Sequence, residues 1–80
     1  MMPCYWIVTY EEKFKAGKPL LDAQNRPKID SVTIGPFFEE ERLRAFVDKN
    51  VHLKYKLFKC DERARDKATR KIREGKAEEI

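Results

Sequence analysis

Apolar and polar residues alternate with a period of two along residues 51–60, "VHLKYKLFKC", until Phe58 and Lys59 break the rhythm. Successive side chains of a strand point to opposite faces of a sheet, whereas a helix would scatter these lysines around its axis. The pattern therefore predicts a strand with one solvated face. Residues 4–14, "CYWIVTYEEKF", and 29–34, "IDSVTI", predict two more strands, because both segments are rich in aromatic and β-branched residues.

The remaining segments predict two helices and a loop. Residues 38–50, "FEEERLRAFVDKN", carry Leu43, Phe46 and Val47 at the i, i+3, i+4 spacing of an amphipathic helix. Three glutamates crowd its first turn, where the helix dipole favours negative charge. A second, highly charged helix is predicted after residue 60. Between the first two strands, glycine, proline and asparagine residues of the segment 15–28, "KAGKPLLDAQNRPK", predict a long loop.

This order of elements restricts the topology. A right-handed crossover through the first helix makes the second and third strands parallel and leaves room for the first strand between them. We therefore predict an α+β fold of the type ββαβα. It has a three-stranded antiparallel/mixed sheet in the order 2-1-3, half of a ferredoxin-like split βαβ unit, with one packed helix. Residues 1–60 are expected to form the compact ββαβ domain, and residues 61–80 a charged C-terminal helix or tail.

The apolar pattern also predicts which side chains share a face. We expect the packed helix to cover seven apolar side chains: Trp6, Val8, Val32, Ile34, Leu53, Tyr55 and Leu57. This arrangement pairs Trp6 with Leu57 across the first and third strands. That register would point Cys4 and Cys60 to opposite sides of the sheet and disfavour a disulfide. The second sheet face would then present nine side chains: Tyr5, Ile7, Thr9, Ser31, Thr33, His52, Lys54, Lys56 and Phe58. Four of them are candidate contacts: Tyr5, Lys54, Lys56 and Phe58.

Composition excludes several classes of protein. Eighty residues form one domain with a small core, and the net charge of +4 attracts anionic partners weakly without selecting among them. No apolar stretch approaches the roughly 20 residues of a membrane span. Because the N-terminus has neither a basic lead-in nor a small-residue cleavage site, we expect no secretory signal. We predict a cytoplasmic, reducing environment in which both cysteines are free thiols.

The sequence contains no recognisable catalytic or metal-binding motif. Two cysteines and one histidine are too few for a zinc site with ordinary ligand spacing, and the three glycines are isolated from one another. His52 has no neighbouring nucleophile, and the single serine, Ser31, has no partner in the sequence. We therefore predict a protein that is not an enzyme and that uses no metal and no cofactor.

Three interpretations of the second sheet face remain open. The C-terminal helix could cover it through Ala64, Ala68 and Ile72, leaving the lysines as rim residues that protect an edge strand. Single-stranded nucleic acid could stack on Tyr5 and Phe58, with lysines contacting phosphates. A protein partner could bind there, since tyrosine, phenylalanine and arginine are enriched in interfaces.

We favour a small accessory or regulatory protein that binds another protein within a larger assembly, with nucleic-acid binding as the alternative. Long loops in compact domains are often functional, so the adjacent leucines of the loop join the candidate contacts. The last helix adds a run of basic side chains. The predicted partner-binding residues are Leu20, Leu21, Tyr5, Lys54, Lys56, Phe58, Arg63, Arg65, Lys67, Arg70, Lys71 and Arg73.

Overall fold

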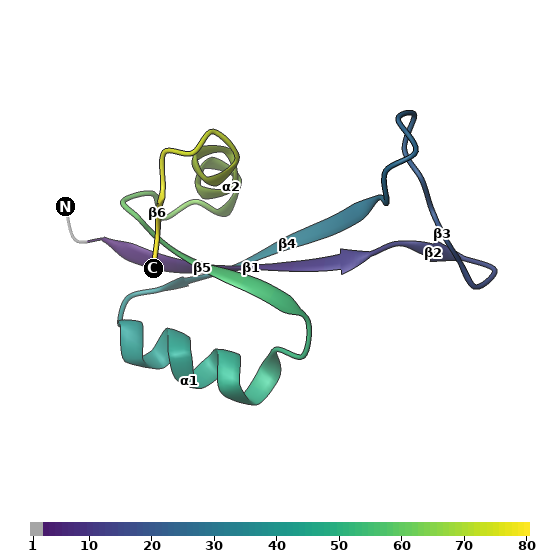
Figure 1. The fold of residues 1–80 in the computed structure, drawn as a ribbon. Helices are drawn as coiled ribbons and strands as arrows, with labels where there is room; N and C mark the ends of the chain where they lie inside the picture. The colour runs from purple at the N-terminus through teal and green to yellow at the C-terminus, as the bar shows by residue number, and fades with distance from the viewer. Residues whose placement is uncertain (1–2) are drawn as a thin grey trace.

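The structure, a computed structural model, describes residues 3–80 and has the predicted α+β class. One antiparallel sheet has the strand order β4-β1-β5-β6. Its strands are β1 (Cys4–Glu12), β4 (Ile29–Phe37), β5 (Lys54–Cys60) and β6 (Glu78–Glu79). Helix α1 (Glu40–Asn50) covers one face of this sheet and helix α2 (Arg65–Arg73) lies on the other (Figure 1). Neither helix of the described chain has the length and hydropathy of a membrane span.

The three long strands lie in the predicted order, because β1 pairs antiparallel with both β4 and β5. The prediction of a three-stranded sheet is wrong. Residues 78–79 add a fourth strand, which pairs Glu79 with Phe58 and Glu78 with Lys59. The sequence could not predict this strand, because its two residues are glutamates and carry no apolar pattern. They belong to the sheet through backbone pairing with β5.

The register between β1 and β5 differs by one residue from the predicted one. Trp6 lies opposite Phe58, and Ile7 lies opposite Leu57. A shift of one residue moves a side chain to the other face of a sheet. The predicted faces are therefore wrong: Ile7 and Leu57 pack against Leu43 and Val47 of α1, while Trp6 lies on the side of α2.

The C-terminal segment packs against the sheet. Ala68 of α2 is buried with Trp6, and the partly buried Ile72 and Ala77 border the same cluster. The hydroxyl groups of Thr69 in α2 and Thr33 in β4 lie 3.0 Å apart, at hydrogen-bond distance. The last helix therefore lies on the sheet through Ala68 and Ile72, as one interpretation expected, but Ala64 is exposed and the residue of β1 that α2 covers is Trp6 rather than Tyr5.

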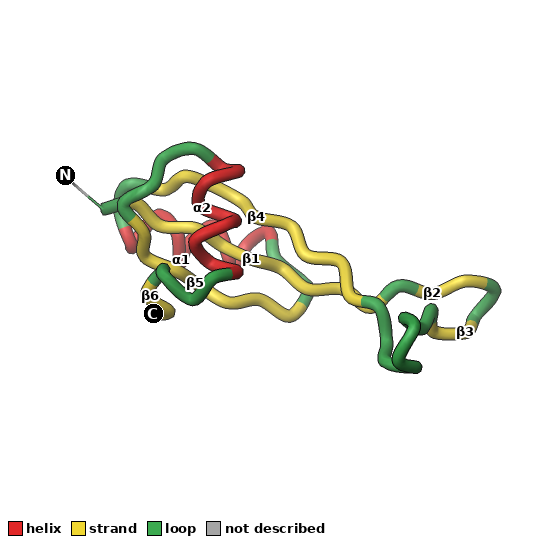
Figure 2. The backbone as a smooth tube through the Cα atoms, turned by 90° about the horizontal axis from the view of Figure 1, so that it is seen from above, coloured by secondary structure: helices red, strands yellow, loops and turns green. Residues whose placement is uncertain are grey.

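Residues 13–28, called the arm below, extend from the end of the main sheet (Figure 2). The loop predicted here contains a separate two-stranded sheet of β2 (Phe14–Lys15) and β3 (Lys18–Pro19). Ala16 and Gly17 connect these strands with φ angles of 52° and 76°. Two successive positive φ angles are typical of the tightest β-hairpin turns, and only glycine adopts them without strain.

Candidate protein interface

Backbone hydrogen bonds connect the segments of the arm where it leaves the sheet. Lys13 N–H donates to the Lys28 carbonyl at 3.0 Å, and Leu20 N–H donates to the Lys13 carbonyl at 2.8 Å. Lys28 N–H donates to the Leu20 carbonyl, also at 2.8 Å. Because three chain segments are joined in this way, the arm has a defined shape although nearly all of its residues are exposed.

The arm has a second turn, which Asp22 organises. Its carboxylate accepts hydrogen bonds from the backbone N–H groups of Arg26 at 2.9 Å and Gln24 at 2.8 Å. These two hydrogen bonds hold the pKa of the Asp22 carboxyl below its ordinary value, and the bond from Arg26 has the larger effect. Asp22 N–H also donates to the Arg26 carbonyl at 2.8 Å. An aspartate in this role favours a turn, because its side chain replaces backbone partners.

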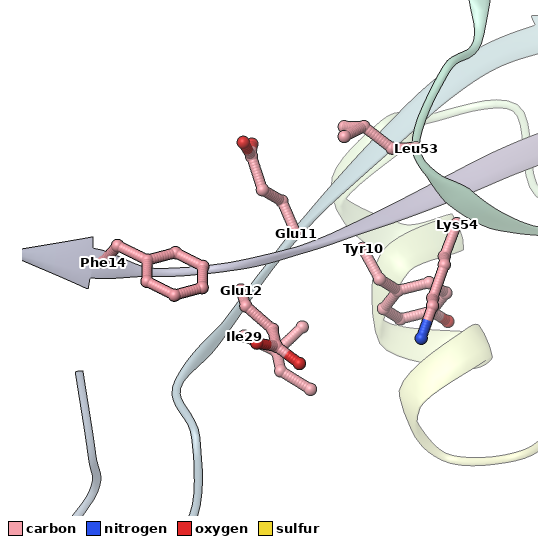
Figure 3. Close-up of a pocket in the computed structure, with 7 residues that line it drawn as sticks. All are labelled: Tyr10, Glu11, Glu12, Phe14, Ile29, Leu53 and Lys54. Atoms are coloured by element: carbon pink, nitrogen blue, oxygen red, sulfur yellow. The ribbon is translucent and has the colours of Figure 1, made fainter. Parts of the chain in front are cut away.

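A pocket of about 310 Å³ lies where the arm meets the main sheet (Figure 3). Apolar side chains that are largely exposed line it: Phe14 at 59%, Ile29 at 58% and Leu53 at 43%. Glu11, Glu12, Tyr10 and Lys54 complete the lining. Large apolar side chains gathered around a concavity are typical of sites that bury part of another molecule.

Two more exposed apolar side chains lie on the face that α1 covers only in part, although both were predicted to lie beneath that helix. Val32 of β4 and Tyr55 of β5 both lie opposite Thr9 of β1, so the three residues form a row across the sheet. Val32 and Tyr55 are exposed, whereas Thr9 between them is buried. Ile29 pairs with Glu12 and therefore lies on the face of the sheet opposite to Val32. We call the three apolar residues that line the pocket, Phe14, Ile29 and Leu53, the arm-base surface.

The predicted contact residues are divided among several places. Leu21 is exposed on the arm, where it pairs with Pro27 in an isolated bridge, and Leu20 is half-buried. Lys54 lies on the wall of the pocket. Lys56 is exposed on the α2 side of the sheet, with its Nζ 3.9 Å from Glu79 Oε1. Of the predicted sheet residues, Lys54 alone therefore belongs to the pocket.

Tyr5 and Phe58 do not form a common aromatic surface. Phe58 is buried on the α2 side, with 8% of its surface exposed, and pairs with Glu79 of β6. Tyr5 is half-buried on the opposite face, where it packs against the cluster beneath α1. Their predicted placement on one exposed face is wrong, and the physical reason is the one-residue difference in register.

The basic side chains around α2 are mostly exposed and are separate from the arm. Arg63 stacks its guanidinium over the Phe38 ring, 5.5 Å from the ring centroid. Lys71 is half-buried, and its Nζ lies 2.8 Å from the Asp61 carboxylate. This hydrogen bond lowers the pKa of the Asp61 carboxyl and raises the pKa of Lys71. The other predicted basic residues of this segment are exposed: Arg65, Lys67, Arg70 and Arg73.

Sequence reasoning missed Phe14, Ile29 and Leu53. Phe14 and Ile29 lie at the ends of predicted strands, where an apolar side chain can as easily be buried as exposed. Leu53 was predicted to lie inside a strand beneath the packed helix, and this prediction is wrong because its side chain is 43% exposed. The signal was that all three border turn segments. Whether such residues come together depends on the direction in which the arm leaves the sheet. The hydrophobic pattern of the sequence does not predict that direction.

Among residues 3–80, no group of three histidine, cysteine, aspartate or glutamate side chains is arranged to hold a metal ion. Comparisons of the chain with protein-family models, with curated proteins and with solved structures gave no match. A functional assignment for this chain therefore depends on the geometry of the arm and its base.

Proposed function

We propose that this protein is a non-enzymatic accessory protein that binds another protein through the arm and the arm-base surface. The observation that carries the proposal is the pocket at the arm base, where Phe14, Ile29 and Leu53 are exposed together. Burial of such side chains against a partner is favourable by roughly 25 cal/mol for each Å² of apolar surface removed from water. A hydrogen-bonded arm also loses less conformational entropy on binding than a flexible loop would.

The pocket favours an apolar anchor side chain from the partner. Binding energy in protein interfaces is concentrated in a few well-packed aromatic or aliphatic anchors that fill such pockets. The charged groups around this pocket have both signs, with Glu11 and Glu12 against Lys54. We therefore expect a leucine, isoleucine or phenylalanine of the partner to enter the pocket, with polar groups around it.

The same geometry argues against single-stranded nucleic acid at the arm base. Two carboxylates border the pocket and would repel phosphates, whereas nucleic-acid grooves are positively charged. On the sheet, Phe58 is buried and cannot stack on a base. The exposed arginines of α2 could contact phosphates, but they are separate from the arm base.

Site-specific photo-crosslinking in cells that make the protein tests the proposal. A photoreactive phenylalanine analogue replaces Phe14, and the matched control carries it at Arg42, whose side chain is 79% exposed on α1. We expect one discrete protein adduct from position 14 and none from position 42. Ile29→Asp should remove the adduct, because it places an uncompensated charge in the pocket while the body of the fold keeps its core.

Two results would contradict the proposal. Equal labelling from positions 14 and 42 would mean that the arm base has no preferred partner. An adduct that nuclease digestion removes would identify nucleic acid instead, and its formation should then decline steeply with salt because counterions are released on binding. Trp6 fluorescence of each variant checks that the fold is retained, since Trp6 is fully buried.

A further inference from the structure

Cys4 and Cys60 lie directly opposite one another on β1 and β5. Their predicted placement on opposite sides of the sheet is wrong, again because the register differs by one residue. Directly opposite residues of antiparallel strands have Cα atoms roughly 4.5 or 5.5 Å apart and side chains on the same face. Both separations fall within the range of about 4.4 to 6.8 Å that disulfide bonds span.

Both thiols are free and belong to the cluster beneath α2. Cys4 is fully buried and Cys60 is 6% exposed, and they share this cluster with Trp6 and Ala68. Cys4 Sγ–H donates to the Glu62 carbonyl at 2.9 Å, and the Trp6 indole N–H donates to the same oxygen at 3.0 Å. The backbone N–H of Glu62 donates to Cys60 Sγ at 3.4 Å. The two sulfur atoms therefore both contact the connection between β5 and α2.

We propose that Cys4 and Cys60 are a site of reversible oxidation, which forms an intramolecular disulfide by exchange with a low-molecular-weight disulfide such as oxidised glutathione. The inference is independent of the arm, and it concerns the end of the sheet nearest to α2. Neither thiol has a role in the proposed protein interface.

The exchange proceeds in two balanced steps. The Cys60 thiolate attacks one sulfur of oxidised glutathione, the S–S bond of glutathione breaks, and one glutathione thiolate leaves and takes up a proton. The Cys4 thiolate then attacks Cys60 Sγ of the mixed disulfide and releases the second glutathione. Two protein thiols lose two electrons, and one glutathione disulfide is reduced to two thiols.

Cys60 is the better first nucleophile because it is the more exposed of the two cysteine residues. Burial is the main cause that raises the pKa of the Cys4 thiol above its ordinary value, so little of it is thiolate at neutral pH. Cys4 therefore resolves the mixed disulfide and does not begin the exchange. Once the disulfide has formed, Cys4 no longer donates to the Glu62 carbonyl, which keeps the Trp6 indole N–H as a donor.

Redox titration of the full chain tests the inference. The protein is equilibrated with reduced and oxidised glutathione at a series of ratios, in buffer and in denaturing urea, and remaining thiols are alkylated and counted by intact mass. Closure of a loop as long as residues 4–60 is costly in an unfolded chain, and the native register removes that cost. We expect the equilibrium constant for the intramolecular disulfide to be at least about a hundred-fold larger in the folded protein.

Single substitutions identify the roles of the two sulfurs. Cys4→Ser should stop at the mixed disulfide of Cys60 with glutathione, and Cys60→Ser should react much more slowly. Oxidation of the wild-type protein should also change the fluorescence of Trp6, because this indole shares the cluster with both cysteines.

Three outcomes would overturn the inference: equal constants in buffer and urea, covalent dimers as the main product, or wild-type protein that accumulates only glutathione adducts. The comparison of folded with unfolded wild-type protein needs no variant, so it decides the question even if a serine substitution prevents folding.

Discussion

Gly35→Ala should destabilise the protein strongly, because Gly35 lies where β4 passes over the indole of Trp6. The pairing of β4 with β1 is irregular here: Phe37 lies opposite Tyr5 and Ile34 lies opposite Ile7. Gly35 has a φ of +148°, and a Cβ atom on it would lie 2.8 Å from Trp6 Cε3 and 3.0 Å from the Tyr5 carbonyl oxygen. One obstacle is a fully buried ring and the other is backbone, so neither can move easily.

The magnitude combines two separate costs. Overpacking of a filled core costs roughly 1 to 3 kcal/mol. A side chain at a φ that only glycine adopts readily costs about 1 to 3 kcal/mol more. We expect the free energy of unfolding to fall by about 3 kcal/mol in total. A domain of this size has roughly 4 to 12 kcal/mol of stability, so this loss is a large share of it.

Equilibrium urea unfolding followed by Trp6 fluorescence measures the effect, with Gly75→Ala as the matched control. Gly75 also has a positive φ, +71°, but apart from Gly75 and its chain neighbours no heavy atom of the described residues was found within 4 Å of the position of its Cβ. It should therefore show only the backbone cost, about 1 kcal/mol. Equal losses in the two variants would refute the reasoning, because they would mean that the contact with Trp6 adds nothing.

Two further predictions concern charged groups. Asp61 has a lowered pKa through Lys71, so its contribution to stability is present above the unfolded pKa, about 3.9, and is lost as the pH falls through the lower folded value. Urea midpoints of Asp61→Asn and wild type should therefore differ at neutral pH and converge in strong acid, and a constant difference at every pH would contradict this assignment. Asp22→Ala should speed amide hydrogen exchange at Gln24 and Arg26 and leave the urea midpoint unchanged, since Asp22 bonds only within the turn 22–26 of the arm. A lower midpoint would mean that the arm stabilises the body of the fold.

The elements with a single apolar face were predictable from the sequence. The spacing of Leu43 and Val47 predicted α1, and both side chains are buried against the sheet. The order of the three long strands followed from chain connectivity and the right-handed crossover. Both predictions hold whichever face of the central strand β1 is covered by α1.

The candidate site was predicted less well, because it depends on which apolar side chains of the sheet the two helices leave exposed. Leu21 was expected to be exposed and is, yet the pocket is formed by Phe14, Ile29 and Leu53 at element ends. In a chain this small, α1 and α2 leave one end of the sheet open, and apolar residues at that end remain in solvent. The sequence shows which residues are apolar. Which of these residues are buried is determined by how the helices pack on the sheet.

The register of β1 against β5 could have been predicted from side-chain size. Both faces of β1 are apolar, so hydrophobic matching alone permits Trp6 to lie opposite either Leu57 or Phe58. The short helix α2, however, offers the small Ala68 to the sheet, whereas α1 offers larger side chains such as Leu43. Close packing favours an arrangement in which the largest residue of β1 faces the smaller side chain Ala68, and this places Trp6 beneath α2 and aligns the two cysteines.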